Sequence, residues 1–305
     1  MTMMTSIEPF RLKPGFSERV WGRQSLQPWY AETGMKERVG EAWLTGPQCV
    51  VETGPFAGRT LTEVASEMGG EFPLLVKLLF PEEKLSVQVH PDDAQAKAMG
   101  ETRGKTECWY VLEAQQGAAV ALGLKAGVEV AQIAAAVADG TMESLMEWVP
   151  VSVGEMLFVD AGTVHAIGPG VVLLETQQTS DVTYRLYDYG RPRELHLEKG
   201  LKVIRTKTTA GKVASRQMNG FTRLIEQRYF VVDRFEVGRA SEANVSFDTR
   251  GCLVGVAGRA VVITADGDVA LNPGQAVVVP EGNGSVIVET GPGVSFVRCV
   301  APRGV

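Results

Sequence analysis

The sequence predicts a mainly β protein of two small barrels with a small helical insertion. Most of its 305 residues form short apolar runs bounded by Gly and Pro, and one strand–turn–strand pattern recurs 120 positions later in the chain. Short strands at such spacing are typical of all-β sandwiches and barrels rather than of alternating β and α units. The length fits about two domains.

The predicted strands are rich in Val, Leu and Ile, and three helical segments interrupt them. The strands cover 74–79, 109–112, 171–174, 260–264, 276–280, 285–288 and 294–300. A capping-box pattern at 60–63 predicts a short helix over 60–68, before two glycines. Apolar residues recur on one helical face over 127–148, which we expect as an insertion at about 126–148. A third helix is predicted over 197–203.

The repeated unit joins an apolar strand to tight turns. The first copy, 154–165, reads G-x5-D-x-G-x2-H, and the second, 274–285, reads G-x5-P-x-G-x2-S. This pattern resembles the second motif of the cupin superfamily, whose jelly-roll barrels often hold a metal at the mouth. The resemblance implies two cupin-like jelly rolls, with a metal-binding, catalytic domain over 1–205 and a degenerate domain over 215–305. Serine replaces histidine in the second copy, which predicts a C-terminal barrel without metal.

Composition and charge exclude several classes of protein. Hydrophobic residues make up 45% and charged residues 22% of the chain, which excludes a disordered or collagen-like protein. A net charge of −6 argues against a nucleic-acid partner or a polybasic membrane binder. The first residues lack a secretory signal pattern and no apolar run reaches about 18 residues, so we expect a cytoplasmic protein. The four scattered cysteines predict reduced, buried thiols.

One predicted strand carries a polar face. In the run 85–90, apolar residues occupy alternate positions, so the side chains of Ser86, Gln88 and His90 lie together on the opposite face. Pro91 then ends the strand. The apolar face fills a core, and the polar face lines a wet or metal-holding site. A lone histidine at a strand end more often only satisfies a hydrogen bond, so its polar neighbours carry the argument for metal.

A second strand repeats this arrangement, because Lys105 and Glu107 also share one face. With the histidine of the first repeat copy, the candidate ligands are Gln88, His90, Glu107 and His165. Two imidazoles, a carboxylate and an amide oxygen suit one Zn²⁺ per chain at about 2.0–2.2 Å, and Mn, Fe or Co could also occupy the set. His196 lacks such neighbours, and we expect it only to begin a helix.

A dense block of polar residues follows the apolar run 171–174. Glu175 and Asp181 are its candidate carboxylates. Arg185 and Arg191 are the local cations that could bind an anionic substrate in an otherwise acidic chain. The alternative interpretation is a solvated loop with surface ion pairs.

Three segments are similar to successive motifs of the class I mannose-6-phosphate isomerases, in their short bacterial form. They read FPLLVKLLFPEEKLSVQVHPDD, GKTECWYVL and DAGTVHAIGPGVVLLETQQTSDVTYRLYDYGR, and WGRQSL and GEAW match further upstream. The matches run in order from about residue 9 to 204. The C-terminal third fits only as a degenerate second barrel.

This resemblance implies roles for single positions. The four candidate ligands match the zinc ligands of the family. The other matches are an active-site arginine, a serine near the sugar phosphate and two pocket positions: Arg185, Ser86, Lys105 and Glu175. Ile167 departs from the pattern, because the long family members carry a tyrosine there.

The implied activity interconverts mannose 6-phosphate and fructose 6-phosphate. After ring opening, a base removes the C2 proton and a proton returns to C1 through an enediol, while the metal polarises substrate oxygens. Arg185 is the first candidate for stabilising the enediolate. Glu175, and after it Asp181, are the candidates for acid–base work. Lys105 would assist ring opening or hold the phosphate, and Arg191 would bind substrate.

Two other functions fit the same residues. A dioxygenase could use two histidines and one carboxylate as a facial triad, and it would consume O₂ with iron bound. A sugar-phosphate-binding protein would keep the pocket without turnover. Gln88 as a fourth ligand, with Lys105 and Arg185 as pocket cations, favours the isomerase.

Overall fold

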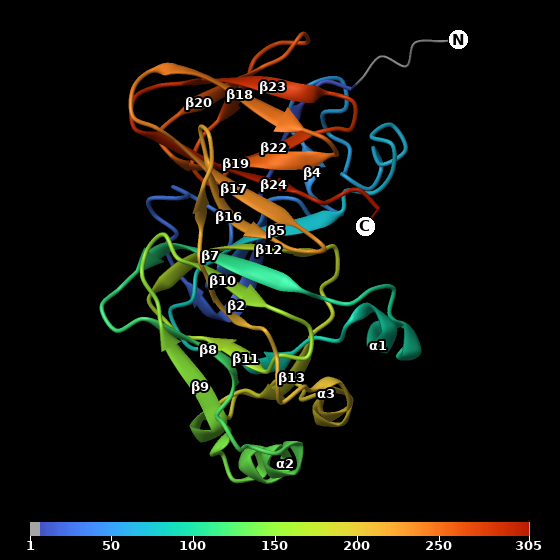
Figure 1. Ribbon diagram of the computed structural model, residues 1–305, viewed down its shortest axis with the longest axis vertical. Coiled ribbons are helices and arrows are strands. Elements are labelled where there is room, and N and C mark those ends of the chain that lie inside the picture. The colour runs from blue at the N-terminus through green and yellow to red at the C-terminus, as the bar shows by residue number, and fades with distance from the viewer. Residues whose placement is uncertain (1–6, 305) are drawn as a thin grey trace.

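The computed structural model describes residues 7–304 and is mainly β, which confirms the predicted fold class (Figure 1). Four sheets form two stacked sandwiches, the first in the lower half of Figure 1 and the second in the upper half. The strands pair antiparallel, as double-sheet jelly rolls require.

The first sandwich contains the candidate ligands. Its seven-stranded sheet has the order β14 (Gly211–Val213), β10 (Met156–Val159), β7 (Glu107–Ala114), β12 (Val171–Gln178), β5 (Leu74–Leu79), β3 (Val39–Trp43) and β2 (Gly15–Arg23). Its five-stranded sheet has the order β13 (Tyr184–Tyr187), β6 (Val87–Val89), β11 (His165–Ile167), β8 (Ala119–Leu124) and β9 (Met146–Pro150). A core between the two sheets includes the fully buried Trp109, Leu157 and Val171.

The second sandwich recruits strands from both ends of the sequence. Its eight-stranded sheet has the order β15 (Arg216–Gln217), β16 (Thr222–Glu226), β17 (Val231–Val237), β24 (Val294–Val300), β19 (Gly251–Ala257), β22 (Ala276–Val279), β1 (Phe10–Lys13) and β4 (Val50–Val51). Its four-stranded sheet has the order β18 (Ser241–Phe247), β23 (Gly284–Thr290), β20 (Ala260–Ile263) and β21 (Val269–Leu271). Phe10 of β1 pairs with Val278 of β22. The division into 1–205 and 215–305 stays a prediction.

The two sandwiches pack through one shared core, which explains why β5 is apolar on both faces. Val76 and Leu78 contribute to this core together with Val232 and Cys252 of the second sandwich. Alternate residues of β5 point into the first sandwich instead, as Leu79 does. The single charged residue of this strand is therefore placed inside the first sandwich, where it is 2% exposed: Lys77.

Two of the three predicted helical segments are present. α3 (Leu197–Val203) has the predicted bounds. The segment between β8 and β9 contains α2 (Val130–Ala138) and the 3₁₀ turn η1 (Met142–Leu145). Helical structure ends at Leu145, before the predicted end at 148, because Trp148 belongs to β9. A further helix, α1 (Asp93–Ala98), was not predicted, although Asp92 and Gln95 form a capping box at its start.

The predicted helix over 60–68 is wrong, because this segment forms successive turns. The capping contact itself exists, since the Thr60 amide donates to Glu63 Oε2 at 2.6 Å. The following amides alternate between partners three and four residues back, as Ala65 to Thr62 and Met68 to Val64 illustrate. A regular i to i−4 ladder is not established, so the sequence signal marks a capped turn rather than a helix.

Both copies of the repeated unit adopt the expected buried strand, β10 in the first and β22 in the second. The flanking glycines of both copies have positive φ, for example 88° at Gly162 and 76° at Gly274. Such backbone favours glycine, and a Cβ at Gly274 would also meet the Tyr30 ring at 2.9 Å. The turns therefore depend on these glycines.

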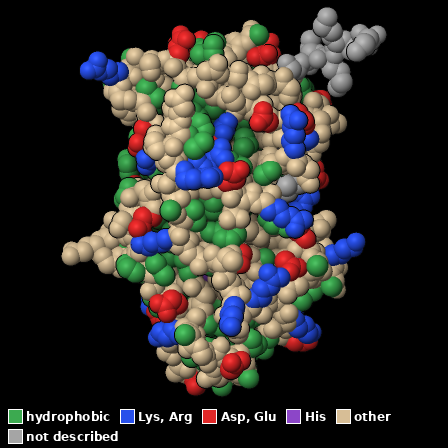
Figure 2. All heavy atoms as spheres, in the orientation of Figure 1, with side chains coloured by type: hydrophobic (Ala, Val, Ile, Leu, Met, Phe, Trp, Pro, Cys, Tyr) green, Lys and Arg blue, Asp and Glu red, His purple; other side chains and the backbone are tan. Residues whose placement is uncertain are grey.

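The four cysteines are free and buried, as predicted. Basic and acidic side chains are interspersed over the face that Figure 2 shows. Among the described residues, no helix is long and apolar enough to cross a membrane.

Candidate active site

The two sheets of the first sandwich bring three of the predicted ligands together. His90 follows β6, Glu107 begins β7 and His165 begins β11. Glu107 Oε2 lies 3.5 Å from His90 Nε2, and Glu107 Oε1 lies 3.4 Å from His165 Nε2. The fourth predicted ligand, Gln88, pairs with His165 in register, and its amide group contacts the His165 Nε2 atom at 3.2 Å.

The facing atoms of this cluster are short of hydrogen-bond donors. His90 Nε2 and Glu107 Oε1 are buried without a hydrogen-bond partner, and Glu107 Oε2 has only the ion pair with Lys105 at 2.9 Å. The opposite ring nitrogens are held, because His90 Nδ1 contacts the Val182 carbonyl at 2.8 Å and His165 Nδ1 contacts the Thr163 carbonyl at 2.9 Å. Because Nδ1 donates its hydrogen to a backbone carbonyl, Nε2 carries the lone pair and can bind a metal. Carbonyls orient metal-binding histidines in the same way in known metal sites. The donor set therefore fits a metal ion.

Burial also sets the charge of the two imidazoles. It lowers the pKa of His165 to about 4, and the nearby Lys105 acts in the same direction. Burial, Lys105 and His165 together hold the pKa of His90 well below its usual value. Both rings are therefore neutral at pH 7, which is the form that binds a metal.

A buried ion network adjoins the cluster. Lys105 Nζ lies 2.9 Å from Glu107 Oε2. Although burial opposes its charge, Glu107 and Glu175 raise the pKa of Lys105, so the ammonium stays protonated. Burial raises the pKa of Glu175 to about 7, although Lys105 lowers it in part. The Trp109 indole donates to Glu175 Oε1 at 3.1 Å.

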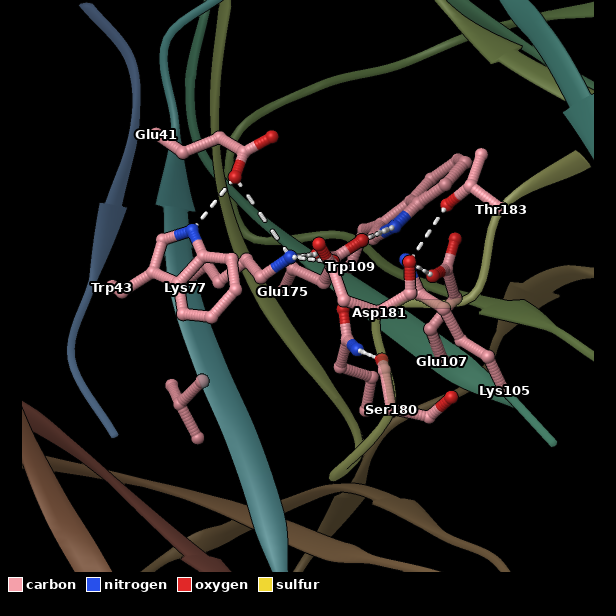
Figure 3. A network of polar contacts seen from close by, with 12 residues as sticks. Glu41, Trp43, Lys77, Lys105, Glu107, Trp109, Glu175, Ser180, Asp181 and Thr183 are labelled. Carbon is pink, nitrogen blue, oxygen red and sulfur yellow. Dashed lines mark hydrogen bonds and ion pairs between the residues drawn. The ribbon is translucent and has the colours of Figure 1, made fainter. Parts of the chain in front are cut away.

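Lys77 is the residue that sequence reasoning missed. Its Nζ lies 2.7 Å from Asp181 Oδ1, 3.8 Å from Glu41 Oε2 and 3.9 Å from Glu175 Oε2, and it lies over the Trp43 ring (Figure 3). The sequence contains a signal for it, because a single lysine in an otherwise apolar buried strand needs carboxylates nearby to pair with its charge. Asp181 stays ionised because Lys77 and Lys105 outweigh the effect of burial and lower its pKa.

A cavity of about 520 Å³ is lined by Glu41, Lys77, Lys105, Glu175 and Asp181 of this network but not by His90, Glu107 or His165. The predicted site residues that line it are Ser86, Gln88, Lys105, Glu175, Asp181 and Arg185. Arg185 donates to the Glu194 carbonyl, and its Nε atom is buried without a partner. Arg19 and Arg193 also line the cavity and were not predicted.

Arg191 does not line this cavity. It donates to the Lys84 carbonyl at 2.7 Å and to the Asp188 carbonyl at 3.2 Å. The neighbouring Arg193 reaches the cavity instead, while both its Nε and one terminal nitrogen donate to the Asp188 carboxylate. Asp188 thus joins the two arginines, so Arg191 contacts the cavity only through this shared carboxylate. Its predicted contact with substrate stays a prediction.

Similarity to known proteins identifies the family. Residues 9–122 match the family model "Phosphomannose isomerase type I, catalytic domain". Mannose-6-phosphate isomerase ManA of Bacillus subtilis is 39% identical over 259 residues, which cover 77% of this chain and 81% of the relative. The chain belongs to the phosphomannose isomerase family. The resemblance inferred from the motifs is therefore confirmed.

Other family members agree in sequence and in fold. The mannose-6-phosphate isomerase of Streptococcus mutans is 35% identical over 257 residues, covering 75% of this chain and 79% of the relative. The crystal structure of the mannose 6-phosphate isomerase from Bacillus subtilis superposes with a TM-score of 0.86 at 29% identity, covering 96% of this chain and 100% of that one. The two-sandwich architecture is thus shared with a phosphomannose isomerase.

Proposed function

We propose that the chain is a metal-dependent isomerase that interconverts mannose 6-phosphate and fructose 6-phosphate. The observation that carries the proposal is the buried Glu107 carboxylate, which faces two imidazole Nε2 atoms and the Lys105 ammonium beside the cavity. Membership of the phosphomannose isomerase family supports this substrate. A phosphorylated sugar is then the partner, and the cytoplasm remains the expected location on the sequence grounds given above.

We assign Gln88, His90, Glu107 and His165 as ligands of one Zn²⁺ per chain, with other divalent metals as substitutes. The metal would act as a Lewis acid that polarises the sugar oxygens next to C1 and C2. Turning the Gln88 side-chain amide would present its oxygen, which the sequence analysis also expects.

Glu175 is our candidate for the base that takes the C2 proton and returns one to C1. A pKa near 7 suits this work, because the carboxyl group can both accept and release a proton close to neutral pH. Asp181 is the second candidate. Lys77 lies 3.9 Å from the Glu175 carboxylate and also pairs with Asp181, and this pairing keeps Asp181 ionised beside Glu175.

The cations of the cavity can stabilise the negative charges of the substrate phosphate and of the enediolate. Lys105 is fully charged and faces the cavity, where it assists ring opening by donating a proton to the ring oxygen or by holding it through a hydrogen bond. Arg185 has an unpartnered Nε atom that can stabilise the enediolate. Ser86 lines the cavity and would contact the phosphorylated end, with Arg191 supporting that end through Asp188 and Arg193.

The decisive experiment is isomerisation of mannose 6-phosphate in a coupled fructose 6-phosphate assay, before and after chelation and zinc addition. We expect activity that disappears with the chelator and returns with the metal. One bound metal per chain without any isomerisation would refute the proposed reaction. Oxygen consumption by the iron-loaded protein would favour the dioxygenase, and substrate binding without turnover would favour the binding protein.

A further inference from the structure

The second sandwich touches the neighbourhood of the candidate metal ligands through one tyrosine. Tyr229 lies in the turn between β16 and β17. Its hydroxyl donates to Asp93 Oδ2 at 2.6 Å, across the junction of the two sandwiches. Asp93 is the first residue of α1 and lies three residues after His90, which follows the strand that carries Gln88.

The other oxygen of Asp93 continues the contact toward β7. Asp93 Oδ1 accepts from the Gly104 amide at 2.9 Å and from Gln178 Nε2 at 3.0 Å. Gln178 Oε1 accepts from the Thr106 amide at 2.9 Å. Three of these four hydrogen bonds form a continuous chain from the second sandwich through Asp93 and Gln178 to the start of β7, and the Gly104 amide joins it at Asp93.

This chain ends between the two residues that matter most to the site. Thr106 separates Lys105 from Glu107, and both of these side chains belong to the buried ion network. The Glu107 oxygens have no hydrogen-bonding donor apart from the ion pair with Lys105. The position of this carboxylate is therefore set by its backbone, which β10 and β12 hold on both sides of β7 and which the Gly104 and Thr106 amides hold just before the strand.

We propose that Tyr229 is a positioning residue, through which the second sandwich fixes Lys105 and Glu107 for metal binding and turnover. The inference rests on the proposed function, because it assigns Glu107 to a metal. The second sandwich, whose repeat copy has serine in place of the ligand histidine, thereby contributes to the site in the first sandwich. Each link pairs a defined donor with a defined acceptor, so removing the first donor leaves the Asp93 carboxylate free to shift.

The charge of Asp93 agrees with this arrangement. Burial disfavours its ionised form, but hydrogen bonds from Tyr229, Gly104 and Gln178 outweigh that effect and lower its pKa. Asp93 is therefore an ionised acceptor for all three donors. Charge-assisted hydrogen bonds are stronger and more directional than neutral ones.

A matched control exists elsewhere in the interface. Tyr30 also donates its hydroxyl across the junction, to the Gly274 carbonyl at 2.5 Å, but this bond does not lead to Lys105 or Glu107. Tyr229→Phe and Tyr30→Phe each remove one hydroxyl from the same junction. Any general loosening of the two sandwiches should affect both variants, whereas loss of positioning should affect only the first.

The test loads the metal-free chains with Co²⁺ and records the visible absorption spectrum and the affinity, without substrate. We expect Tyr229→Phe to shift the spectrum and to weaken Co²⁺ binding about five-fold, and Tyr30→Phe to leave both unchanged. In the coupled assay, we expect kcat of Tyr229→Phe to fall by a similar factor with little change in KM.

Identical Co²⁺ spectra and affinities for the two variants would overturn the inference, and so would a parent protein that binds no Co²⁺. If Tyr229→Phe does not fold, Asp93→Asn serves instead, because its amide offers one acceptor for three donors, and the same spectral shift is expected. A parent protein that binds Co²⁺ but does not isomerise mannose 6-phosphate would refute the proposed reaction while the Co²⁺ comparison still decides the role of Tyr229.

Discussion

Lys77 Nζ lies 2.7 Å from Asp181 Oδ1, and this contact joins the middle of β5 to the loop that follows β12. Both elements also border Glu175, so one ammonium group connects the two candidate carboxylates of the acid–base step. Lys77 is buried while the Asp181 side chain is 49% exposed, and the ammonium places a positive charge beside the position where a proton would be taken.

Replacing this charge should destabilise the protein and stop turnover. In Lys77→Met, the buried Glu175 carboxylate loses a cation at 3.9 Å and Glu41 keeps only Arg19, so we expect a loss of about 3–5 kcal/mol of unfolding free energy. Thermal and urea unfolding measure this loss. Lys202→Met is the control, since Lys202 pairs with Glu198 on exposed α3 and should change stability by less than about 0.5 kcal/mol. Equal effects of the two variants would contradict the buried network.

The raised pKa of Glu175 predicts the pH dependence. A base must be ionised, so kcat/KM should increase as the pH rises through about 7, and Glu175→Gln should remove this limb together with most of the activity. The folded state favours the protonated form, so stability contributed by this group is present below pH 4.5 and is lost as the pH rises through about 7. Glu175→Gln should accordingly be more stable than the parent protein at pH 8. A variant that retains the limb would exclude Glu175 as the titrating group.

Substitution should distinguish the two histidines of the cluster, His90 and His165, from His196. His90→Ala should lose the bound metal and the activity together, because it removes a buried ligand atom that has no other partner. His196→Ala should retain the metal, since His196 precedes α3 and its ring accepts from the Arg185 amide and does not face the cluster. Metal content by elemental analysis measures the difference. Full activity of the metal-free parent would reject the site altogether.

Arg185 and Arg191 should differ in kinetics. Arg185→Ala removes an unpartnered donor from the cavity, so we expect kcat to fall about 10²-fold with metal content and folding retained. Arg191→Ala removes contacts to Asp188 and Lys84, and it should mainly raise KM by releasing Arg193. Loss of metal or of folding in Arg185→Ala would make Arg185 a structural residue.

Period-two alternation and turn chemistry explain why much of this fold and site could be predicted. Ser86, Gln88 and His90 share a face because strands impose it, and the repeat placed His165 beside them. Lys77 was missed because an apolar run predicts that a strand is buried but does not show which of its two faces lines the functional site. Arg193 was missed because its place in the cavity depends on Asp188, a contact that local pattern does not encode. The turns at 60–68 were mistaken for a helix because a capping box reports only how a segment begins.

The pairing of Phe10 with Val278 has a consequence for synthesis of the chain. β1 and β4 emerge from the ribosome early and pair with each other, but β22, the partner on the other side of β1, is made near the end of translation. Contacts between such distant positions slow folding and leave strand edges open in the meantime. The eight-stranded sheet therefore closes only after nearly the whole chain has been synthesised, and a fragment ending near residue 205 would leave the β22-facing edge of β1 unpaired and prone to aggregation.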